Sequence, residues 1–304
     1  MTTRRGIYAR VFLGCRSDGD RWRRKGQEMA NVRLDTIGYW SEVKLDMVRK
    51  YAAAYSRILS RQTGIRAHLY IDGFAGPGVH ISSRTGDFVQ GSPLNALKVE
   101  PPFSEYHFID LDGGKAAHLR ELVGERSDVH VYEGDCNEVL LKHVFPRARY
   151  NEYRRALCLL DPYKINLHWE VIRQAGSSGS IEIFLNFMVM DMNRNVLWRN
   201  PDGVSAVQQQ RMNRFWGDDS WRQAAYDTKQ NLFGLEEKNA NDQVAEAFRQ
   251  RLERAAGFGF VPAPMPMRNS TGAVIYYLFF ASPNRTGAKI VQDIFSTYRN
   301  REVR

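Results

Sequence analysis

The sequence has few cysteines and no long apolar run. Its 304 residues include only Cys15, Cys136 and Cys158, whose spacing fits neither a metal-ligand motif nor a disulfide framework. No apolar stretch approaches the roughly 20 residues of a transmembrane helix, and the basic N-terminus lacks the apolar core of a secretory signal. There are no internal repeats and no low-complexity tract. These absences argue against a disulfide scaffold, a cysteine metal site and a membrane protein, so we expect a cytoplasmic protein without a bound metal.

Positive charge is concentrated at the start of the chain. The net charge is +9, and residues 1–30 contribute five of these charges. Because residues 1–33 also show little hydrophobic periodicity, we expect a poorly ordered basic arm there. Residues 34–304 are only mildly basic, which suits a nucleotide or polyanion but is more often a solvated surface. A hydrophobic content of 43% predicts that this part folds as a domain with a large core.

Short apolar runs alternate with helical patterns through the folded part. Buried strands are predicted at 67–71, 105–110, 129–132, 156–160 and 180–187, because each run is too short for a helix and is bounded by turn residues. Helices are predicted at 41–61, 93–99, 115–123 and 169–174, and a loop at 80–90. Strand, helix and strand at this spacing indicate parallel βαβ units.

The last third of the chain has a different pattern. Residues from about 190 to 257 are polar and helical, and we expect a helical insertion there that covers the ligand-binding edge of the sheet. Its tryptophans suit stacking on a base and anchoring in a core equally well. Two strands, 258–268 and 273–281, and a helix at 287–298 follow. The sequence thus predicts a doubly wound α/β domain with a mostly parallel, seven-stranded Rossmann-like sheet.

A glycine-rich turn follows the first predicted strand and organises the rest of the chain. Gly73, Gly76 and Gly78 permit a sharp turn and a close approach of the backbone to a ligand. Asp72, which precedes them, can bind a cation or a ribose hydroxyl. A structural turn without a ligand is the alternative. The motif, which also contains Phe74 and Ala75, resembles the first motif of class I S-adenosylmethionine (SAM) methyltransferases.

Acidic residues also follow the second and third strands. Asp110, with Asp112 close behind, is placed to accept hydrogen bonds from both ribose hydroxyls of a nucleotide. Asp135 follows the third strand and can accept from an adenine amino group. Cys136 is expected beside Asp135 as a packing contact of the cofactor, because nothing marks it as a nucleophile. Each acid alone is a weak signal, and the ordered set is more specific.

The fourth strand ends in Asp161-Pro162-Tyr163. The Asp carboxylate and the carbonyl beside the proline can accept hydrogen bonds from an amine, and the Tyr ring can stack on a planar group. The motif resembles the Asp-Pro-Pro-Tyr motif of amino-methyltransferases that act on adenine or cytosine, with one proline missing. Asp161 and Tyr163 are the catalytic candidates. The alternative is that Asp161 caps the next helix.

Further substrate-binding candidates flank these motifs. Lys44 lies in the first turns of the helix at 41–61 and could meet an anionic group, although a surface lysine is the simpler interpretation. Ser92 is predicted to cap the helix at 93–99, whose N-terminus attracts anions. Asn186, at the end of the fifth strand, and Pro162 complete the expected acceptor contacts.

From residue 39 to the C-terminus the sequence resembles the three-Cys-motif partner protein family. The shared motifs are YW…KL (39–45), YIDGFAGPG (70–78), GSPLNAL (91–97), FIDLD (108–112), GDCN (134–137), LLDPY (159–163), FLNF…MNRN (184–195) and YYLFFAS (276–282). The resemblance implies a class I methyltransferase-like fold that binds SAM, and a partner protein with a three-cysteine iron–sulfur motif similar to radical-SAM proteins.

Three hypotheses about function follow. The first is a SAM-dependent methyltransferase acting on N or O of a nucleoside, nucleotide or similar polar small molecule. The second, motivated by the basic arm, makes DNA or RNA the substrate. The third is a non-catalytic SAM-binding accessory protein that serves the iron–sulfur partner.

Overall fold

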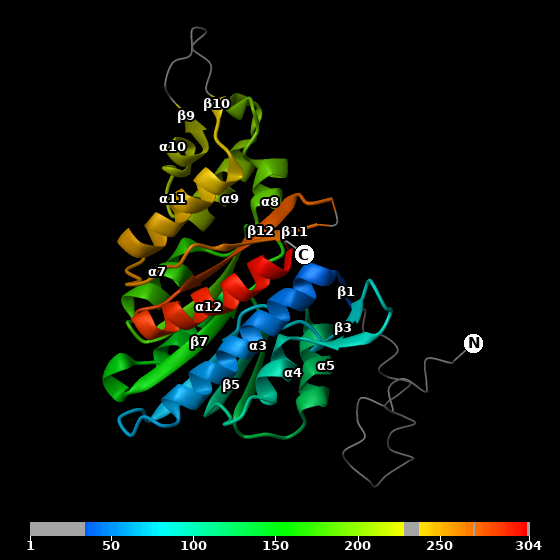
Figure 1. Cartoon of the computed structure of the whole chain (residues 1–304), viewed down its shortest axis with the longest axis vertical. Helices are drawn as coiled ribbons and strands as arrows, with labels where there is room; N and C mark the ends of the chain where they lie inside the picture. The colour runs from blue at the N-terminus through cyan, green and yellow to red at the C-terminus, as the bar shows by residue number, and fades with distance from the viewer. Residues whose placement is uncertain (1–33, 228–236, 270, 303–304) are drawn as a thin grey trace, which may run out of the picture.

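A computed structural model describes residues 34–227, 237–269 and 271–302. The predicted arm at 1–33 lies outside the described residues. The described chain forms a seven-stranded sheet with the order β11-β12-β8-β7-β2-β5-β6 (Figure 1). Its strands are β2 (Ala67–Asp72), β5 (Glu105–Asp110), β6 (Val129–Glu133), β7 (Arg154–Leu160), β8 (Ile181–Phe187), β11 (Met265–Arg268) and β12 (Val274–Ala281).

In the order β6-β5-β2-β7-β8 all neighbouring strands are parallel, whereas β12 is antiparallel to both β8 and β11. Every residue of β2 and of β8 is buried, as expected for central strands covered on both faces. The predicted mostly parallel, seven-stranded Rossmann-like sheet is therefore confirmed. The chain reverses its direction of travel across the sheet beside β2, and open α/β sheets bind ligands next to such a point.

Helices cover both faces of the sheet. Helices α3 (Tyr39–Leu59) and α12 (Arg285–Glu302) lie side by side on one face (Figure 1). The core on this face also contains residues of α4 (Ser92–Leu97) and α5 (Gly113–Val123). The other face is covered by α7 (Trp169–Ser177) and by a segment made of α6 (Cys136–Val139), η2 (Leu140–Val144) and η3 (Phe145–Arg147), with η4 (Tyr150–Glu152) after it. Among the described residues, no helix is both long and apolar enough to span a membrane.

A helical insertion lies between β8 and β11. It contains α8 (Val189–Asn195), η5 (Pro201–Gly203), α9 (Ala206–Trp216), α10 (Trp221–Ala225), α11 (Asn241–Arg254) and the short antiparallel pair β9 (Tyr226–Asp227) and β10 (Glu237–Lys238). Trp216 and Trp221 are buried in the core on the α7 face. These two tryptophans therefore anchor the insertion, whereas Trp198 keeps 42% of its surface exposed.

Three local predictions are wrong. The expected loop at 80–90 is a hairpin of β3 (Val79–Ser82) and β4 (Phe88–Gln90), and β1 (Thr36–Ile37) adds to it in parallel. Strands this short carry too little periodicity to be recognised, because they gain their stability from pairing. The predicted strand at 258–268 is ordered as a strand only from Met265, since Pro262 and Pro264 offer no amide donors. Ser92 does not cap α4: the helix begins at Ser92 itself, with Gly91 at the N-cap position.

Candidate cofactor and acceptor site

Three of the predicted acids end or follow strands that are neighbours in the sheet. Asp72 ends β2, Asp110 ends β5 and Asp135 follows β6 by two residues, and these strands lie in the order β2-β5-β6. Because parallel strands end at the same edge, the three carboxylates share one edge of the sheet. The ends are also joined directly, since Gly134 N donates to Asp110 O over 3.0 Å.

The glycine turn is tied to both neighbours of β2. Gly73 N donates to Leu159 O at 2.9 Å, and Ala75 N donates to Ile109 O at 2.8 Å. The turn also contacts the second acid, because Gly76 N donates to Asp110 Oδ2 at 2.8 Å. Gly78 has a φ of +81°, and a Cβ there would lie 2.9 Å from a Leu119 methyl group. The backbone is therefore held across the edge of the sheet in a form that requires glycine.

Asp72 is completely buried at the start of this turn. Its Oδ1 accepts from Phe74 N at 3.1 Å, and its Oδ2 has no hydrogen-bond partner among the described residues. Burial raises the pKa of Asp72 to about 7, although the nearby Ser92 hydroxyl and the Phe74 amide oppose the shift. An orphaned carboxylate oxygen beside a glycine turn fits the ammonium group of a bound amino acid moiety, because a cation would satisfy it and restore its charge.

The other acids at this edge also have structural contacts. Asp112 caps α5, and its Oδ1 accepts from Gly114 N and Lys115 N at 2.9 and 3.1 Å. Asp135 caps α6 in the same way, accepting from Asn137 N at 2.8 Å. Both residues are exposed, and these hydrogen bonds engage only one carboxylate oxygen of each. The predicted cofactor contacts of Asp112 and Asp135 stay predictions.

Cys136 is buried next to Asp135. Burial raises the pKa of its thiol to about 12, so the thiol is neutral at physiological pH. The side chain packs in the core on the α7 face. This environment suits a packing residue.

Lys44, Asp161 and Asn186 form a polar cluster at the same edge. The Lys44 ammonium pairs with Asp161 Oδ2, and Asn186 Nδ2 donates to Asp161 Oδ1. Only 6% of Lys44 is exposed, so the interpretation of Lys44 as a surface lysine is wrong. Its ammonium also lies 5.6 Å from the centre of the Tyr276 ring. Three candidates that are far apart in the sequence are thus in direct contact.

Side-chain alternation explains why this cluster forms. Asp72, Asp161 and Asn186 each lie two residues beyond a side chain that packs toward α3, namely Tyr70, Leu159 and Phe184. Helix α3 contacts Phe184 through Tyr51 and reaches Asp161 with Lys44, which is about two turns nearer its N-terminus. The start of α3 therefore lies at the carboxyl edge of the sheet and contributes a cation there.

The Asp161-Pro162-Tyr163 segment does not cap a helix. Helix α7 begins only at Trp169, and His168 occupies its N-cap position, so the capping alternative for Asp161 is wrong. Pro162 is buried, whereas Tyr163 is 68% exposed. The Tyr163 hydroxyl donates to Asp35 Oδ2 over 3.3 Å. Tyr163 is therefore largely exposed and hydrogen-bonded to Asp35, and no hydrogen bond joins its hydroxyl to Asp161 among the described residues.

Sequence reasoning missed the residues that hold the segment after Asp161. Asn137 Oδ1 accepts from His168 N at 2.7 Å, and Asn137 Nδ2 donates to Asn166 O at 3.1 Å. Asp191 in α8 accepts from Ile165 N at 3.0 Å. The only available signal was the Asn of the Gly-Asp-Cys-Asn motif, because its amide can bond to backbone on two sides.

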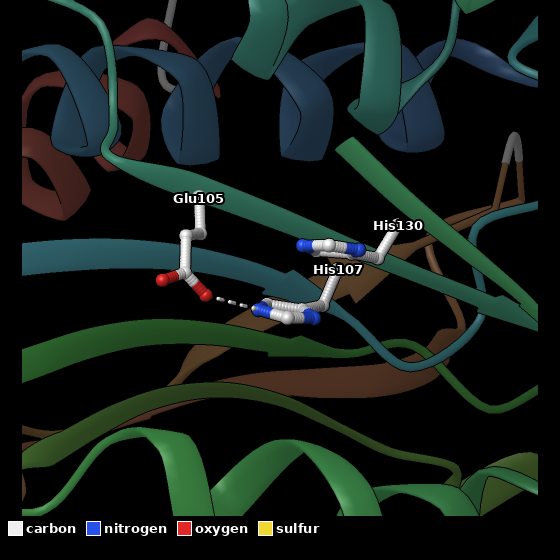
Figure 2. A group of neighbouring side chains, drawn as sticks. All are labelled: Glu105, His107 and His130. Carbon is white, nitrogen blue, oxygen red and sulfur yellow. Dashed lines mark hydrogen bonds and ion pairs between the residues drawn. The ribbon is translucent and has the colours of Figure 1, made fainter. Parts of the chain in front are cut away.

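A second group of titratable side chains lies at the other end of β5. Glu105, His107 and His130 place ligand-type atoms within 4.8 Å of one another (Figure 2). The carboxylate of Glu105, however, already pairs with Arg147 at 2.9 Å and Arg154 at 2.5 Å. Two guanidinium groups on the same carboxylate oppose the binding of a divalent cation.

The histidines of this group are also engaged. His107 Nε2 lies 3.2 Å from Glu105 Oε2, and its Nδ1 lies 3.2 Å from the Tyr132 hydroxyl. The ring of His107 stacks on His130, with centroids 4.9 Å apart. The group is therefore an internal hydrogen-bond and ion-pair network between β5, β6 and β7, distant from the edge that carries Asp110.

Comparisons with known proteins identify structural likeness only. No family model matches the sequence, and no curated protein matches it. A Legionella pneumophila protein of the DUF519 family has 11% identity and a TM-score of 0.47, covering 86% of this chain and 91% of that chain. Trm1 from Pyrococcus horikoshii, solved with S-adenosyl-L-methionine, has 10% identity and a TM-score of 0.39, covering 82% and 58%. A SAM-dependent methyltransferase from Anabaena variabilis has 10% identity and a TM-score of 0.36, covering 86% and 92%. The seven-stranded, mostly parallel Rossmann-like fold of this chain accordingly rests on its own strand order.

Proposed function

We propose that this protein is a SAM-dependent methyltransferase that acts on N or O of a nucleoside, nucleotide or similar polar small molecule. The observation that carries the proposal is the set of carboxylates at the ends of β2, β5 and β6, arranged around a turn in which a glycine is sterically required. The orphaned Oδ2 of Asp72 fits a cofactor that brings a cationic amino group.

The residues have separate roles in this proposal. The backbone at Gly73, Gly76 and Gly78 holds the cofactor close to the edge of the sheet. Asp72 binds its amino group, Asp110 its ribose hydroxyls and Asp135 its adenine amino group. When bound, SAM supplies an electrophilic methyl group on a sulfonium.

Methyl transfer makes modest demands on the protein. The leaving sulfur becomes neutral, so no departing anion has to be stabilised, and alignment of the two reactants supplies much of the rate. What remains is to orient the acceptor and to take a proton from it. Asp161 suits both tasks, because Lys44 and Asn186 fix its two oxygens while 26% of its side chain stays accessible.

Nucleic acid is a second candidate substrate. The exposed ring of Tyr163, two residues from Asp161, offers a flat apolar surface on which a base can stack. A tritium-labelled methyl group from SAM would then transfer to DNA or RNA, and binding would weaken steeply with salt. An iron–sulfur partner protein is a further proposal, which rests on the sequence resemblance alone.

Isothermal titration calorimetry with SAM and S-adenosylhomocysteine tests the proposed function. We expect both compounds to bind the wild-type protein, and Asp72→Asn and Asp110→Asn to weaken both. Asp293→Asn, at an exposed position of α12, is the matched control and should bind like wild type. A wild-type protein that binds neither compound contradicts the proposal.

A further inference from the structure

Unpartnered polar atoms gather at one edge of the sheet. Among the described residues, five buried side-chain atoms have no hydrogen-bond partner, and four of them belong to Asp72, His80, Asn186 and Tyr276. Leaving such an atom unpaired costs roughly 1–3 kcal/mol. Native proteins leave few buried polar atoms unpaired, and such an atom marks a strained position, a catalytic role or a bound water, ion or ligand. Four such atoms around the Lys44–Asp161 pair therefore indicate binding surface.

The four atoms divide into two pairs. Asp72 and His80 lie at the glycine turn: Asp72 precedes it, and a Cβ on Gly76 would lie 3.7 Å from an atom of the His80 ring in β3. Asn186 and Tyr276 lie on β8 and β12, beyond β7 in the sheet. Asp161, at the end of β7, separates the two pairs. The cofactor candidates are all on the first side.

Asn186 and Tyr276 project from the same face of neighbouring strands. Leu278 pairs with Asn186 in the antiparallel ladder, and Tyr276 lies two residues nearer the carboxyl edge of β8. Both side chains share the α3 face with Lys44, and they are only 2% and 6% exposed. Tyr276 borders the Lys44–Asp161 ion pair, since its ring centre lies 5.6 Å from the Lys44 ammonium, and Asn186 borders the same pair through Asp161.

The existing contacts of Asn186 and Tyr276 determine which hydrogen bonds they can still make. Because Asn186 Nδ2 donates to Asp161 Oδ1, the Asn186 Oδ1 must face elsewhere and can only accept a hydrogen bond. Burial raises the pKa of Tyr276 well above its usual value, so its hydroxyl is neutral and can donate or accept. Asn186 Oδ1 and the Tyr276 hydroxyl can therefore together hydrogen-bond to a ligand atom that carries both a hydrogen and a lone pair.

We propose that Asn186 Oδ1, the Tyr276 hydroxyl and Asp161 form the acceptor subsite, which positions a nitrogen or oxygen that still bears a hydrogen. The inference rests on the proposed function. The lone pair of the acceptor forms the new bond to the methyl carbon, and the C–S bond breaks with its electron pair remaining on sulfur. The hydrogen of the acceptor passes as a proton to Asp161 and then to solvent, while Asn186 and Tyr276 act as positioning residues.

Sinefungin tests the subsite without knowledge of the acceptor. This analogue carries an amine where SAM carries its methyl group, whereas S-adenosylhomocysteine carries nothing there. If the subsite faces the transferred methyl, the amine donates to it, and we expect calorimetry to give about tenfold tighter binding of sinefungin than of S-adenosylhomocysteine. Tyr276→Phe and Asn186→Leu should each reduce this ratio severalfold and leave the affinity for S-adenosylhomocysteine within about twofold.

Tyr277→Phe is the matched control, because Tyr277 is next in the strand and packs on the opposite face. Its ratio should equal that of wild type. An equal ratio in wild type and in both subsite variants overturns the subsite but leaves the proposed function standing. Loss of S-adenosylhomocysteine binding in Tyr276→Phe, with an unchanged circular dichroism spectrum, also overturns it. A wild-type protein that binds neither compound contradicts the proposed function itself.

Discussion

At the scale of single residues, the carboxyl edge of the sheet is defined by charges that water hardly reaches. Lys44 and Asp72 are both buried, but their charged groups have different surroundings. Lys44 has a carboxylate partner, whereas one oxygen of Asp72 has no partner among the described residues. The Lys44–Asp161 pair leads to a prediction about stability, and the unpaired oxygen of Asp72 leads to a prediction about binding.

Breaking the Lys44–Asp161 pair should destabilise the protein. Removing one partner leaves an uncompensated charge, which costs about 3–5 kcal/mol in a fully buried pair. Because Asp161 is 26% exposed, we expect Lys44→Met to lower the free energy of unfolding by about 2 kcal/mol in urea denaturation. Lys44→Met with Asp161→Asn should recover most of this loss. Lys142→Met, at an exposed pair with Glu138, should change it by less than about 0.5 kcal/mol, and equal losses in the two lysine variants would contradict the argument.

Cofactor affinity should increase with pH through neutrality. The pKa of Asp72 is raised to about 7, so below that pH the free protein carries a neutral acid that does not attract an ammonium group. The affinity for S-adenosylhomocysteine should therefore rise from pH 6 to pH 8 and level off above it, by up to about tenfold per unit. Calorimetry with Asp72→Asn should show no such rise. Asp110→Asn should bind more weakly yet keep the pH dependence, and a flat wild-type profile would refute the role of Asp72.

At the scale of elements, one buried acid joins four segments. Glu182 in β8 accepts from Ser282 Oγ, after β12, at 2.9 Å and from the Tyr51 hydroxyl of α3. A Cβ on Gly287 in α12 would lie 3.0 Å from the Glu182 carboxylate. The two helices on the α3 face are thereby positioned against the strands that carry Asn186 and Tyr276.

The protonation of Glu182 should make stability depend on pH. Burial raises its pKa from 4.5 to about 7, so between these values the folded chain holds a proton that the unfolded chain releases. Stability therefore falls as pH rises through this window, by about 3 kcal/mol for a shift of this size. In Glu182→Gln the difference in unfolding free energy between pH 5 and pH 8 should shrink by about this amount. Glu138→Gln, at an exposed position, should retain the wild-type difference.

The insertion approaches α7 too closely for any side chain at one position. A Cβ on Gly176 would lie 2.2 Å from the carbonyl oxygen of Ala256, which is backbone and cannot rotate away. We expect Gly176→Ala to destabilise the protein by about 1–3 kcal/mol, as overpacking generally does, measured by thermal or urea unfolding. Gly64→Ala is the control, since nothing lies within 4 Å of its Cβ position. A neutral Gly176→Ala would show that α7 and the insertion are free to separate.

At the scale of the whole molecule, the order of the strands decides which residues meet. The turn and the acids after β2, β5 and β6 form one half of the edge, and Asp161, Asn186 and Tyr276 form the other. A ligand that bridges the turn and the acids binds only the folded chain, so it stabilises the fold by mass action.

S-adenosylhomocysteine should therefore raise the melting temperature. A ligand at 100 times its dissociation constant adds about 2.7 kcal/mol, which corresponds to roughly 5 °C for a domain of this size. Differential scanning calorimetry should show this shift for wild type and for Asp293→Asn. Asp110→Asn at the same ligand concentration should show a smaller one, and the absence of any shift in wild type would argue against a cofactor site.

The sequence predicted the parts of the fold that depend on periodicity and chain order. The parallel strands were recognisable because most of them are largely buried and most end in or just before turn or acidic residues. The hairpin of β3 and β4 was not, because strands of three or four residues have no distinctive pattern. Ser92 looked like a cap because Ser precedes Pro, yet the helix starts one residue earlier.

The candidate site was predictable only in part, because only some of its residues are marked by a local sequence pattern. The acids follow strands, and strand ends can be read from the chain. Lys44, His80 and Tyr276 join the site through packing between distant segments, and in the sequence they look like a surface lysine, a loop histidine and a core aromatic residue. Which atoms stay unpaired is a property of the assembled structure, so no local pattern signals it.

The Lys44–Asp161–Tyr276 arrangement also has a consequence for synthesis of the chain. Lys44 and Asp161 are 117 residues apart in the sequence. Tyr276 lies on β12, which is the last strand of the sheet to be synthesised. A nascent chain on the ribosome can thus hold a finished glycine turn while the acceptor side is still missing. Because only the folded chain binds such a ligand, the chain should acquire affinity for the cofactor and the capacity for transfer together, once the strand that carries Tyr276 has left the ribosome.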